Sequence, residues 1–258
     1  MVDSARPMSP PVVATIERDA IAQSLREGFA DFMARPTTAI FVIVVYPFIG
    51  LLMYRFAFDR DLLPLLFPIA SGFALVGPLS AAGLYEISRR REAGAPLDGV
   101  TAYGILSRDK LVPLVLVGAL LLVIYLAWIG AAQAIYGATL GNLVPESVLD
   151  LLAAVFTTTE GWTLLVVGCG VGFVFALVVL AIGAISLPAI VDRGMAPAEA
   201  VALSVSAFVA NPGTMLAWGF VIALGLAVAS LPLFLGLVVV LPIFGHATWH
   251  LYRKLVPR

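Results

Sequence analysis

The chain has 258 residues and a formal net charge of −1, and 61% of its residues are hydrophobic while only 12% are charged. A water-soluble domain is about half apolar and about a quarter charged, so this composition excludes a soluble globular protein and predicts that lipid surrounds much of the surface. A net charge so close to zero also gives no sign of a nucleic-acid partner.

Residues 1–14 include a polar stretch that contains proline, so we predict a disordered tail there. No apolar core of a signal peptide follows this stretch, so we expect no cleavable signal peptide. Residues 15–35 predict an amphipathic helix, in which Asp31 falls on the charged face. The apolar residues recur at helical spacing on the other face: Ile21, Leu25, Phe29, Phe32 and Met33. We expect this helix either to lie in the membrane interface or to pack on the protein itself.

Six apolar segments that are predicted to cross a membrane follow in the chain. They cover residues 38–58, 62–87, 111–134, 162–191, 214–229 and 233–251. Six crossings place both termini on one side, and with the termini in the cytoplasm only Arg55 and Arg60 of the 15 basic residues lie outside. The positive-inside rule therefore predicts cytoplasmic termini. Two more amphipathic helices are expected, at 145–157 in the acidic outer loop and at 196–211.

The chain also carries a weak internal repeat. The segment Phe32-Met-Ala-Arg-Pro-Thr-Thr38 precedes the first predicted span, and Phe208-Val-Ala-Asn-Pro-Gly-Thr214 precedes the fifth. The fold that we predict is an all-α, polytopic membrane helix bundle: a single domain over residues 15–258, with six transmembrane helices. These helices form three helix-hairpin units with interfacial amphipathic helices, and the parallel repeats are expected at 15–94, 95–195 and 196–258.

Ionisable residues cluster where three apolar segments leave the membrane on the predicted cytoplasmic side, and such residues are functional candidates. The candidate cluster comprises Glu86, Arg89, Arg90, Asp192, Arg193, His246 and His250. Glu86 and Arg90 lie four residues apart, on one helix face. Two interpretations stay open: ion pairs that close the helix ends, or groups that line a cytoplasmic vestibule or a lipid-headgroup site.

His246 and His250 are the only histidines in the chain, and their i, i+4 spacing puts both rings on one face of the last predicted span. This spacing suits a metal pair, for which Glu86 or Asp192 would supply further ligands. Interfacial hydrogen bonding is the alternative, and otherwise no cofactor is expected. The single cysteine, Cys169, excludes an intrachain disulfide and a thiolate zinc site, and it is interpreted as a packing residue.

Motifs at these exits resemble the bacterial integral membrane family known as domain of unknown function 2189. The similar stretches are Gly72-Phe73, Gly77-Pro78, Gly83-Leu-Tyr-Glu-Ile-Ser-Arg-Arg90, Val191-Asp-Arg193, Ala210-Asn-Pro212, Trp218-Gly219 and Gly245-His-Ala-Thr-Trp-His-Leu-Tyr-Arg253. The resemblance covers about residues 30–255, and the last motif is its most specific part. It implies a six-span inner-membrane protein of Gram-negative bacteria, and it implies no enzymatic activity.

The sequence contains none of the motifs of hydrolytic, phosphoryl-transfer or dinucleotide chemistry, so we expect no enzyme. The leading hypothesis is an accessory, assembly or scaffolding subunit of a membrane complex, which would meet its membrane-protein partner through the outer helix at 145–157. The alternative is a transporter or channel for a small solute or ion. A third hypothesis is metal or haem binding at His246 and His250.

Overall fold

The fold was derived from a computed structural model, which describes residues 12–17, 19–36, 65, 68–69, 81–95, 107–141, 143, 145–232 and 235–258. Every regular element in these ranges is a helix, so the predicted all-α class is confirmed for them. The first predicted span, 38–58, and most of the second, 62–87, lie outside the described residues. Most of the predicted tail, 1–14, and most of the linker at 95–110 lie outside them as well.

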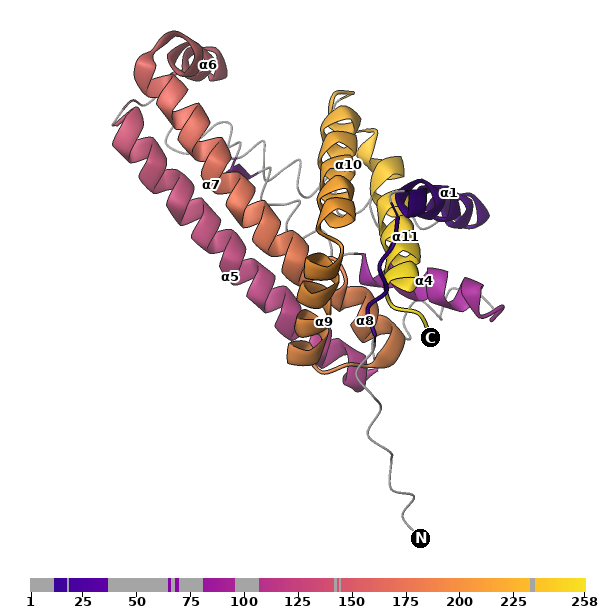
Figure 1. The fold of residues 1–258 in the computed structure, drawn as a ribbon. Helices are drawn as coiled ribbons and strands as arrows, with labels where there is room; N and C mark the ends of the chain where they lie inside the picture. Colours follow the sequence, from indigo (N-terminus) through magenta and orange to yellow (C-terminus); the bar gives the residue numbers. More distant parts are fainter. Residues whose placement is uncertain are drawn as a thin grey trace.

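Two long helices run side by side, α5 (Arg108–Thr139) and α7 (Thr159–Gly183), and the short α6 (Val148–Thr157) joins them at one end (Figure 1). Their sequences are almost continuously apolar, which predicts a helix that is surrounded by lipid or protein on all sides. Trp128 of α5 packs on Phe175 of α7, with 5.7 Å between the ring centroids. Gly172 leaves room for the Trp128 ring, because a Cβ there would lie 2.9 Å from it. The pair forms one firmly packed arm.

The outer helix begins later than predicted. We expected it at 145–157, but α6 begins at Val148, because Ser147 caps it by accepting a hydrogen bond from the Asp150 backbone N–H at 3.2 Å. None of its residues is buried.

The predicted fourth span, 162–191, is broken in the structure. The first part, α7, ends at Gly183, and α8 (Ser186–Arg193) follows after a two-residue turn. At this break the backbone N–H of Ile185 donates to the Ser204 hydroxyl of α9 (Pro197–Ala210) at 3.2 Å, so a side chain replaces a helical partner. Gly194 ends α8 in the left-handed conformation, with φ +63°, as is common at helix C-termini.

The last two helices are α10 (Pro212–Ser230) and α11 (Leu237–Leu255), which were predicted as spans at 214–229 and 233–251. Three helical stretches of the described residues are long and apolar enough to cross a membrane: Asp109–Thr139, Thr159–Arg193 and Pro212–Ser230. The count of six spans and the cytoplasmic position of both termini stay predictions.

The amphipathic helix predicted at 15–35 is α1 (Asp19–Ala34), which lies against α11 (Figure 1). The face that it buries agrees only in part with the predicted apolar face, of which Ile21 and Phe32 are buried. Phe29 and Met33 are 50% and 59% exposed, whereas Gly28 and Asp31 are buried. The reason is that Gly28 admits the backbone of Ala247 on α11, since a Cβ at position 28 would lie 2.5 Å from its nitrogen. This close approach brings Asp31 to polar groups of other helices.

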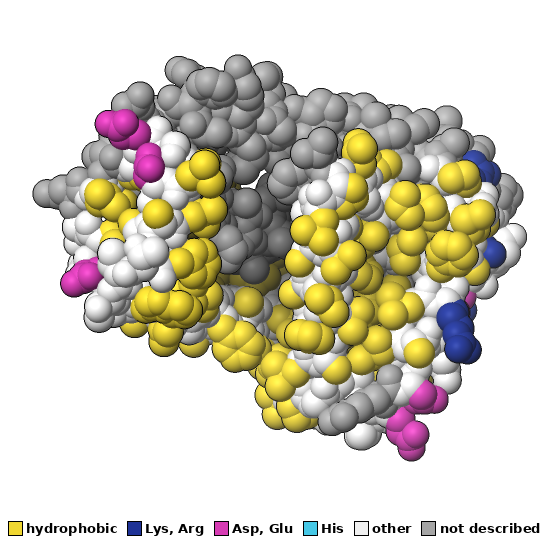
Figure 2. Space-filling view, turned by 90° about the horizontal axis from the view of Figure 1, so that it is seen from above, with side chains coloured by type: hydrophobic (Ala, Val, Ile, Leu, Met, Phe, Trp, Pro, Cys, Tyr) yellow, Lys and Arg dark blue, Asp and Glu magenta, His cyan; other side chains and the backbone are white. Residues whose placement is uncertain are grey.

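The main core lies where α4 (Ala82–Glu92), α8, α9, α11, the first half of α5 and the start of α10 meet. Its largest fully buried side chains include Tyr85, Ile190, Trp218, Trp249 and Tyr252. Seen from above, the molecule shows hydrophobic side chains over much of its visible face and charged side chains near the edges (Figure 2). The ends of α4, α8 and α11 that carry the candidate residues are therefore held in a fixed relation by packing.

Candidate functional site

The seven candidate residues come from three helices that pack together: α4, α8 and α11. The structure divides them into three groups. The Glu86 cluster is Glu86, Arg89, Arg90 and Lys110; the Asp31 cluster is Asp31, Ser88, Arg91, His246 and His250; and the Asp192 cluster is Asp192, Arg193, Tyr252, Arg253 and Glu92. Of these, Asp31, Ser88, Arg91, Glu92, Lys110, Tyr252 and Arg253 were not predicted as site residues.

In the Glu86 cluster, three cations surround one carboxylate. Arg89 donates to both oxygens of Glu86, from Nε at 2.8 Å and from Nη2 at 2.6 Å, and Arg90 donates from Nε at 2.8 Å. The predicted i, i+4 pair of Glu86 and Arg90 is therefore present. Lys110, in the first turn of α5, lies 3.8 Å from Glu86 and donates to the Val191 carbonyl of α8 at 2.5 Å. The cluster joins the ends of α4, α5 and α8.

The Asp31 cluster joins α1, α4 and α11 through one buried carboxylate. The Ser88 hydroxyl donates to Asp31 Oδ2 at 2.5 Å, His250 Nε2 donates to the same oxygen at 2.9 Å, and Arg91 Nη1 donates to Oδ1 at 2.5 Å. Because the Ser88 hydrogen is committed to Asp31, its oxygen accepts from His246 Nδ1 at 2.8 Å. His246 then carries its proton on Nδ1, and its Nε2 is buried without a hydrogen-bond partner in the described part of the chain.

In the Asp192 cluster, Arg253 of α11 bridges two other helix ends. Its guanidinium lies 3.5 Å from Asp192 of α8 and 3.1 Å from Glu92 of α4. The Tyr252 hydroxyl donates to Asp192 at 2.9 Å, and Arg193 pairs more loosely with Asp192, at 3.7 Å. A partly exposed ion pair contributes about 0–1 kcal/mol, so the strength of this cluster lies in the number of helices that it joins.

The two histidines that the third hypothesis considered as metal ligands converge on an acid, but not on Glu86 or Asp192, the acids considered with them. His246 and His250 both face Asp31, at 4.0 and 2.9 Å, whereas Glu86 and Asp192 belong to the other clusters. Within the described residues, no three His, Cys, Asp or Glu side chains are placed so that they could hold a metal ion. Each histidine is hydrogen-bonded to a residue of another helix, His246 to Ser88 and His250 to Asp31.

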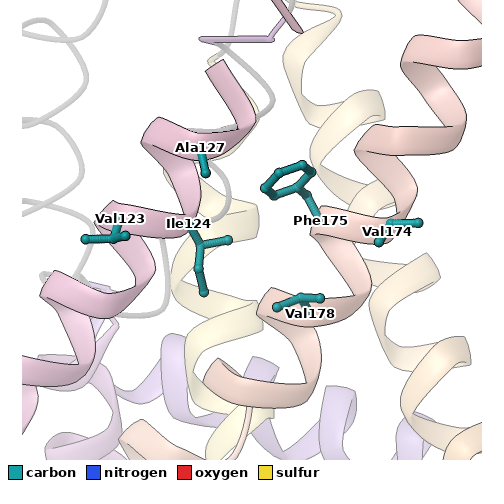
Figure 3. A pocket seen from close by; sticks show the side chains of 6 residues that line it. All are labelled: Val123, Ile124, Ala127, Val174, Phe175 and Val178. Carbon is teal, nitrogen blue, oxygen red and sulfur yellow. The ribbon is translucent and has the colours of Figure 1, made fainter. Parts of the chain in front are cut away.

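A pocket of about 280 Å³ lies away from the candidate residues, between α5 and α7 (Figure 3). Its lining is entirely aliphatic or aromatic: Val123, Ile124, Ala127, Val174, Phe175 and Val178. It offers apolar contact and no polar group for a substrate.

Comparison with known proteins places the chain in a family. Residues 66–192, about half of the chain, match the model of the family DUF2189, described as a predicted integral membrane protein. Over this segment the chain belongs to that family. No curated protein and no solved structure matches it.

The DUF2189 match includes the whole Glu86 cluster and ends at Asp192. The matched range is shorter than the range of about 30–255 over which the sequence motifs resemble this family. The motif at Gly245–Arg253, with its two histidines, therefore lies outside the match. Asp31 lies outside it as well. The Glu86 cluster is therefore the one cluster that lies wholly within the matched range, while the other two are covered only in part.

Asp31 was missed because it falls on the polar side of the helix at 15–35, and no sequence signal distinguishes it from the solvated acids there. Lys110 carries a weak signal, since it directly precedes an apolar run at the predicted membrane boundary. Arg253 was counted only as a basic residue of the terminus. Its role depends on Glu92 and Asp192, which are 161 and 61 residues away in the chain.

The buried Asp31 carboxyl is expected to make the stability of the folded chain sensitive to acid. Burial alone raises its pKa, but hydrogen bonds from His250 and Ser88 outweigh burial and hold the pKa below its usual value of 3.8. The folded state therefore binds this proton less tightly than the unfolded state, and the stabilisation that is present above about pH 4 is lost as the pH falls through the folded pKa. We expect the thermal unfolding midpoint of the full chain in mild detergent to fall steeply below about pH 4. A midpoint unchanged between about pH 5 and pH 3 would contradict this assignment.

Proposed function

We propose that this DUF2189 protein is a non-catalytic accessory, assembly or scaffolding subunit of a bacterial inner-membrane complex, with both termini in the cytoplasm. The observation that carries the proposal is the exposed helix α6 at the free end of the α5–α7 arm. Its apolar residues Leu149, Leu152 and Phe156 are 75%, 45% and 52% exposed. Apolar helix surfaces of this kind are typical of sites that contact another protein or the membrane.

The chemistry around α6 favours a membrane protein as the partner. Leu149, Leu152 and Phe156 recur at helical spacing and form one apolar strip. Acidic residues flank the strip at Glu146, Asp150 and Glu160. Anionic headgroups repel acids, so a partner helix with an apolar face and basic edges complements α6 better than an anionic lipid surface does.

The polar clusters support a structural role over transport. A transporter would use the candidate residues to line an aqueous path. In the structure Glu86, Asp192 and both histidines bind groups on the same or neighbouring helices, and none of them lines the pocket between α5 and α7. These contacts fix the helix ends in place, which a scaffold requires.

The proposal predicts a partner that depends on α6. We expect the full chain, purified in mild detergent after chemical cross-linking in membranes, to carry one partner cross-linked to residues 146–160. The double substitution Leu149→Ser and Leu152→Ser should lower the yield of this complex at least about tenfold, because two exposed leucines contribute about 1.5–3 kcal/mol each when they are buried.

Leu231→Ser is the matched control, since Leu231 is 80% exposed but lies at the end of α10. This variant should retain the partner. Recovery of a single monodisperse chain without any α6 cross-link, or equal losses in both variants, would overturn the proposal.

A further inference from the structure

The Glu86 cluster carries more positive charge than its own acid neutralises. Arg89, Arg90 and Lys110 all approach the single carboxylate of Glu86. The next carboxylate, Asp192, also attracts Arg89 and Lys110. It is shared, however, with two further cations, Arg193 and Arg253, so the region keeps an excess of positive charge. A cluster of three cations around one acid is an attractive site for a further anion.

The donors of Arg90 are only partly used. Its Nε binds Glu86, while its two terminal nitrogens have no hydrogen-bond partner in the described part of the chain. The side chains of Arg89, Arg90 and Lys110 are 29%, 23% and 20% exposed, whereas that of Glu86 is 2% exposed. The carboxylate therefore lies behind the cations, and an anion arriving from outside meets the cations first.

The cluster lies at the level of lipid headgroups. Lys110 occupies the first turn of α5, and the helix from Asp109 to Thr139 is long and apolar enough to cross a membrane. About 20 helical residues span the hydrocarbon core, so the ends of a helix of this length reach the headgroup region. Arg89 and Arg90 contact the same carboxylate as Lys110 and therefore lie at the same depth.

We propose that Arg89, Arg90 and Lys110 form a binding site for the phosphate group of an anionic phospholipid. The planar guanidinium of Arg90 presents two free N–H groups to phosphate oxygens, a geometry that favours two parallel hydrogen bonds. Lys110 adds a compact charge, and Glu86 holds Arg89 and Lys110 in position. The net positive charge favours an anionic lipid, such as phosphatidylglycerol, over zwitterionic phosphatidylcholine. This site goes beyond the scaffolding role and does not depend on it.

The test uses the full chain, purified in detergent and stripped of lipid, with thermal unfolding followed during titration. We expect phosphatidylglycerol to stabilise the wild type with an affinity about tenfold higher than that of phosphatidylcholine, and Arg90→Gln to lose this preference. Arg258→Gln removes one charge from an arginine that is 64% exposed and should keep the preference. Arg90→Lys retains the ion pair with Glu86 but lacks the planar guanidinium that makes two parallel hydrogen bonds, so we expect an intermediate affinity for phosphatidylglycerol. This variant keeps the test decisive even if Arg90→Gln does not fold.

Titration with inorganic phosphate separates the two sources of the anion. If inorganic phosphate stabilises the wild type, the two lipids do not, and Arg90→Gln abolishes the effect, the site binds free phosphate. The assignment of Arg89, Arg90 and Lys110 as a phosphate-binding site is then retained, with free phosphate in place of the lipid. Equal responses to both lipids together with no response to phosphate would overturn the proposal. Equal losses in Arg90→Gln and Arg258→Gln would overturn it too, because they would indicate diffuse surface charge.

Discussion

Replacing Gly28 with alanine is expected to release α1 from α11. A Cβ at position 28 would lie 2.5 Å from the backbone nitrogen and 2.8 Å from the Cα of Ala247, distances that real Cβ contacts do not adopt. The obstacle is backbone inside α11, so the clash can be relieved only by moving one helix. Movement of α1 also withdraws Asp31 from Ser88 and His250. Overpacking costs about 1–3 kcal/mol by itself, and with the lost hydrogen bonds we expect about 3 kcal/mol or more.

Gly83→Ala is the matched control for this prediction. Position 83 lies in helix α4, and among the described residues a Cβ there meets nothing within 4 Å. Alanine has the higher helix propensity, so this variant should be neutral or more stable by up to about 1 kcal/mol. Thermal unfolding of both variants in mild detergent, together with protease sensitivity of residues 19–34, provides the measurement. If Gly28→Ala unfolds at the wild-type temperature with α1 still protected, the close contact between α1 and α11 is wrong.

The packing of α1 shows where sequence periodicity succeeds and where it fails. Hydrophobic spacing predicted the helix itself to within a few residues, because periodicity reports local structure. It placed Phe29 on the apolar face, which would meet either lipid or protein, and the structure leaves Phe29 exposed; it placed Asp31 on the polar face, whereas Asp31 is buried. A glycine that admits a backbone and an acid with distant partners carry no periodic signal. Burial at these positions depends on Ala247 and Ser88, which sequence spacing does not connect to α1.

The candidate site was predicted in part for a similar reason. Arginines and acids at the ends of apolar runs are visible in the sequence, and Glu86 with Arg90 followed from the spacing of one helix. The contacts between helices were not predictable, because Lys110, Arg253 and Asp31 meet their partners only after the bundle has formed. The break at Ile185 was hidden for the same reason, since Ser204 on α9 takes over its backbone hydrogen bond.

Helix packing has one regularity that bears on the predicted repeat. The amphipathic helix of the predicted first unit, α1, packs on α11, which ends the third unit. The amphipathic helix of the third unit, α9, packs on α8, which ends the second. In both cases the helix that opens a unit rests on the exit of the preceding unit in cyclic order. The α9 helix contacts α7 as closely as α8, so the three-unit organisation stays a prediction.

The second large effect is expected at Asp31, a residue that is 5% exposed and whose carboxylate accepts from Ser88, His250 and Arg91. Asp31→Asn keeps the shape of the side chain but removes the charge, and it replaces one acceptor oxygen with an amide that donates. Three donors from α4 and α11 then share a single acceptor. Breaking a buried charged network of this kind costs about 3 kcal/mol, so the unfolding midpoint in mild detergent should fall clearly at neutral pH. Asp19→Asn, on the exposed first turn of the same helix, should leave it nearly unchanged.

A double-mutant cycle with Ser88→Ala tests whether the loss comes from the network itself. Ser88 donates to Asp31 and accepts from His246, so removing its hydroxyl should destabilise the wild type through both contacts. In the Asp31→Asn background the first of these contacts is already weakened, and the same substitution should cost less. We expect a coupling of about 1 kcal/mol between the two positions, within the range measured for residues in direct contact. Simple additivity would show that Asp31 stabilises α1 without the hydrogen bond from Ser88, and that Arg91 is then the residue of α4 on which the link to α1 depends.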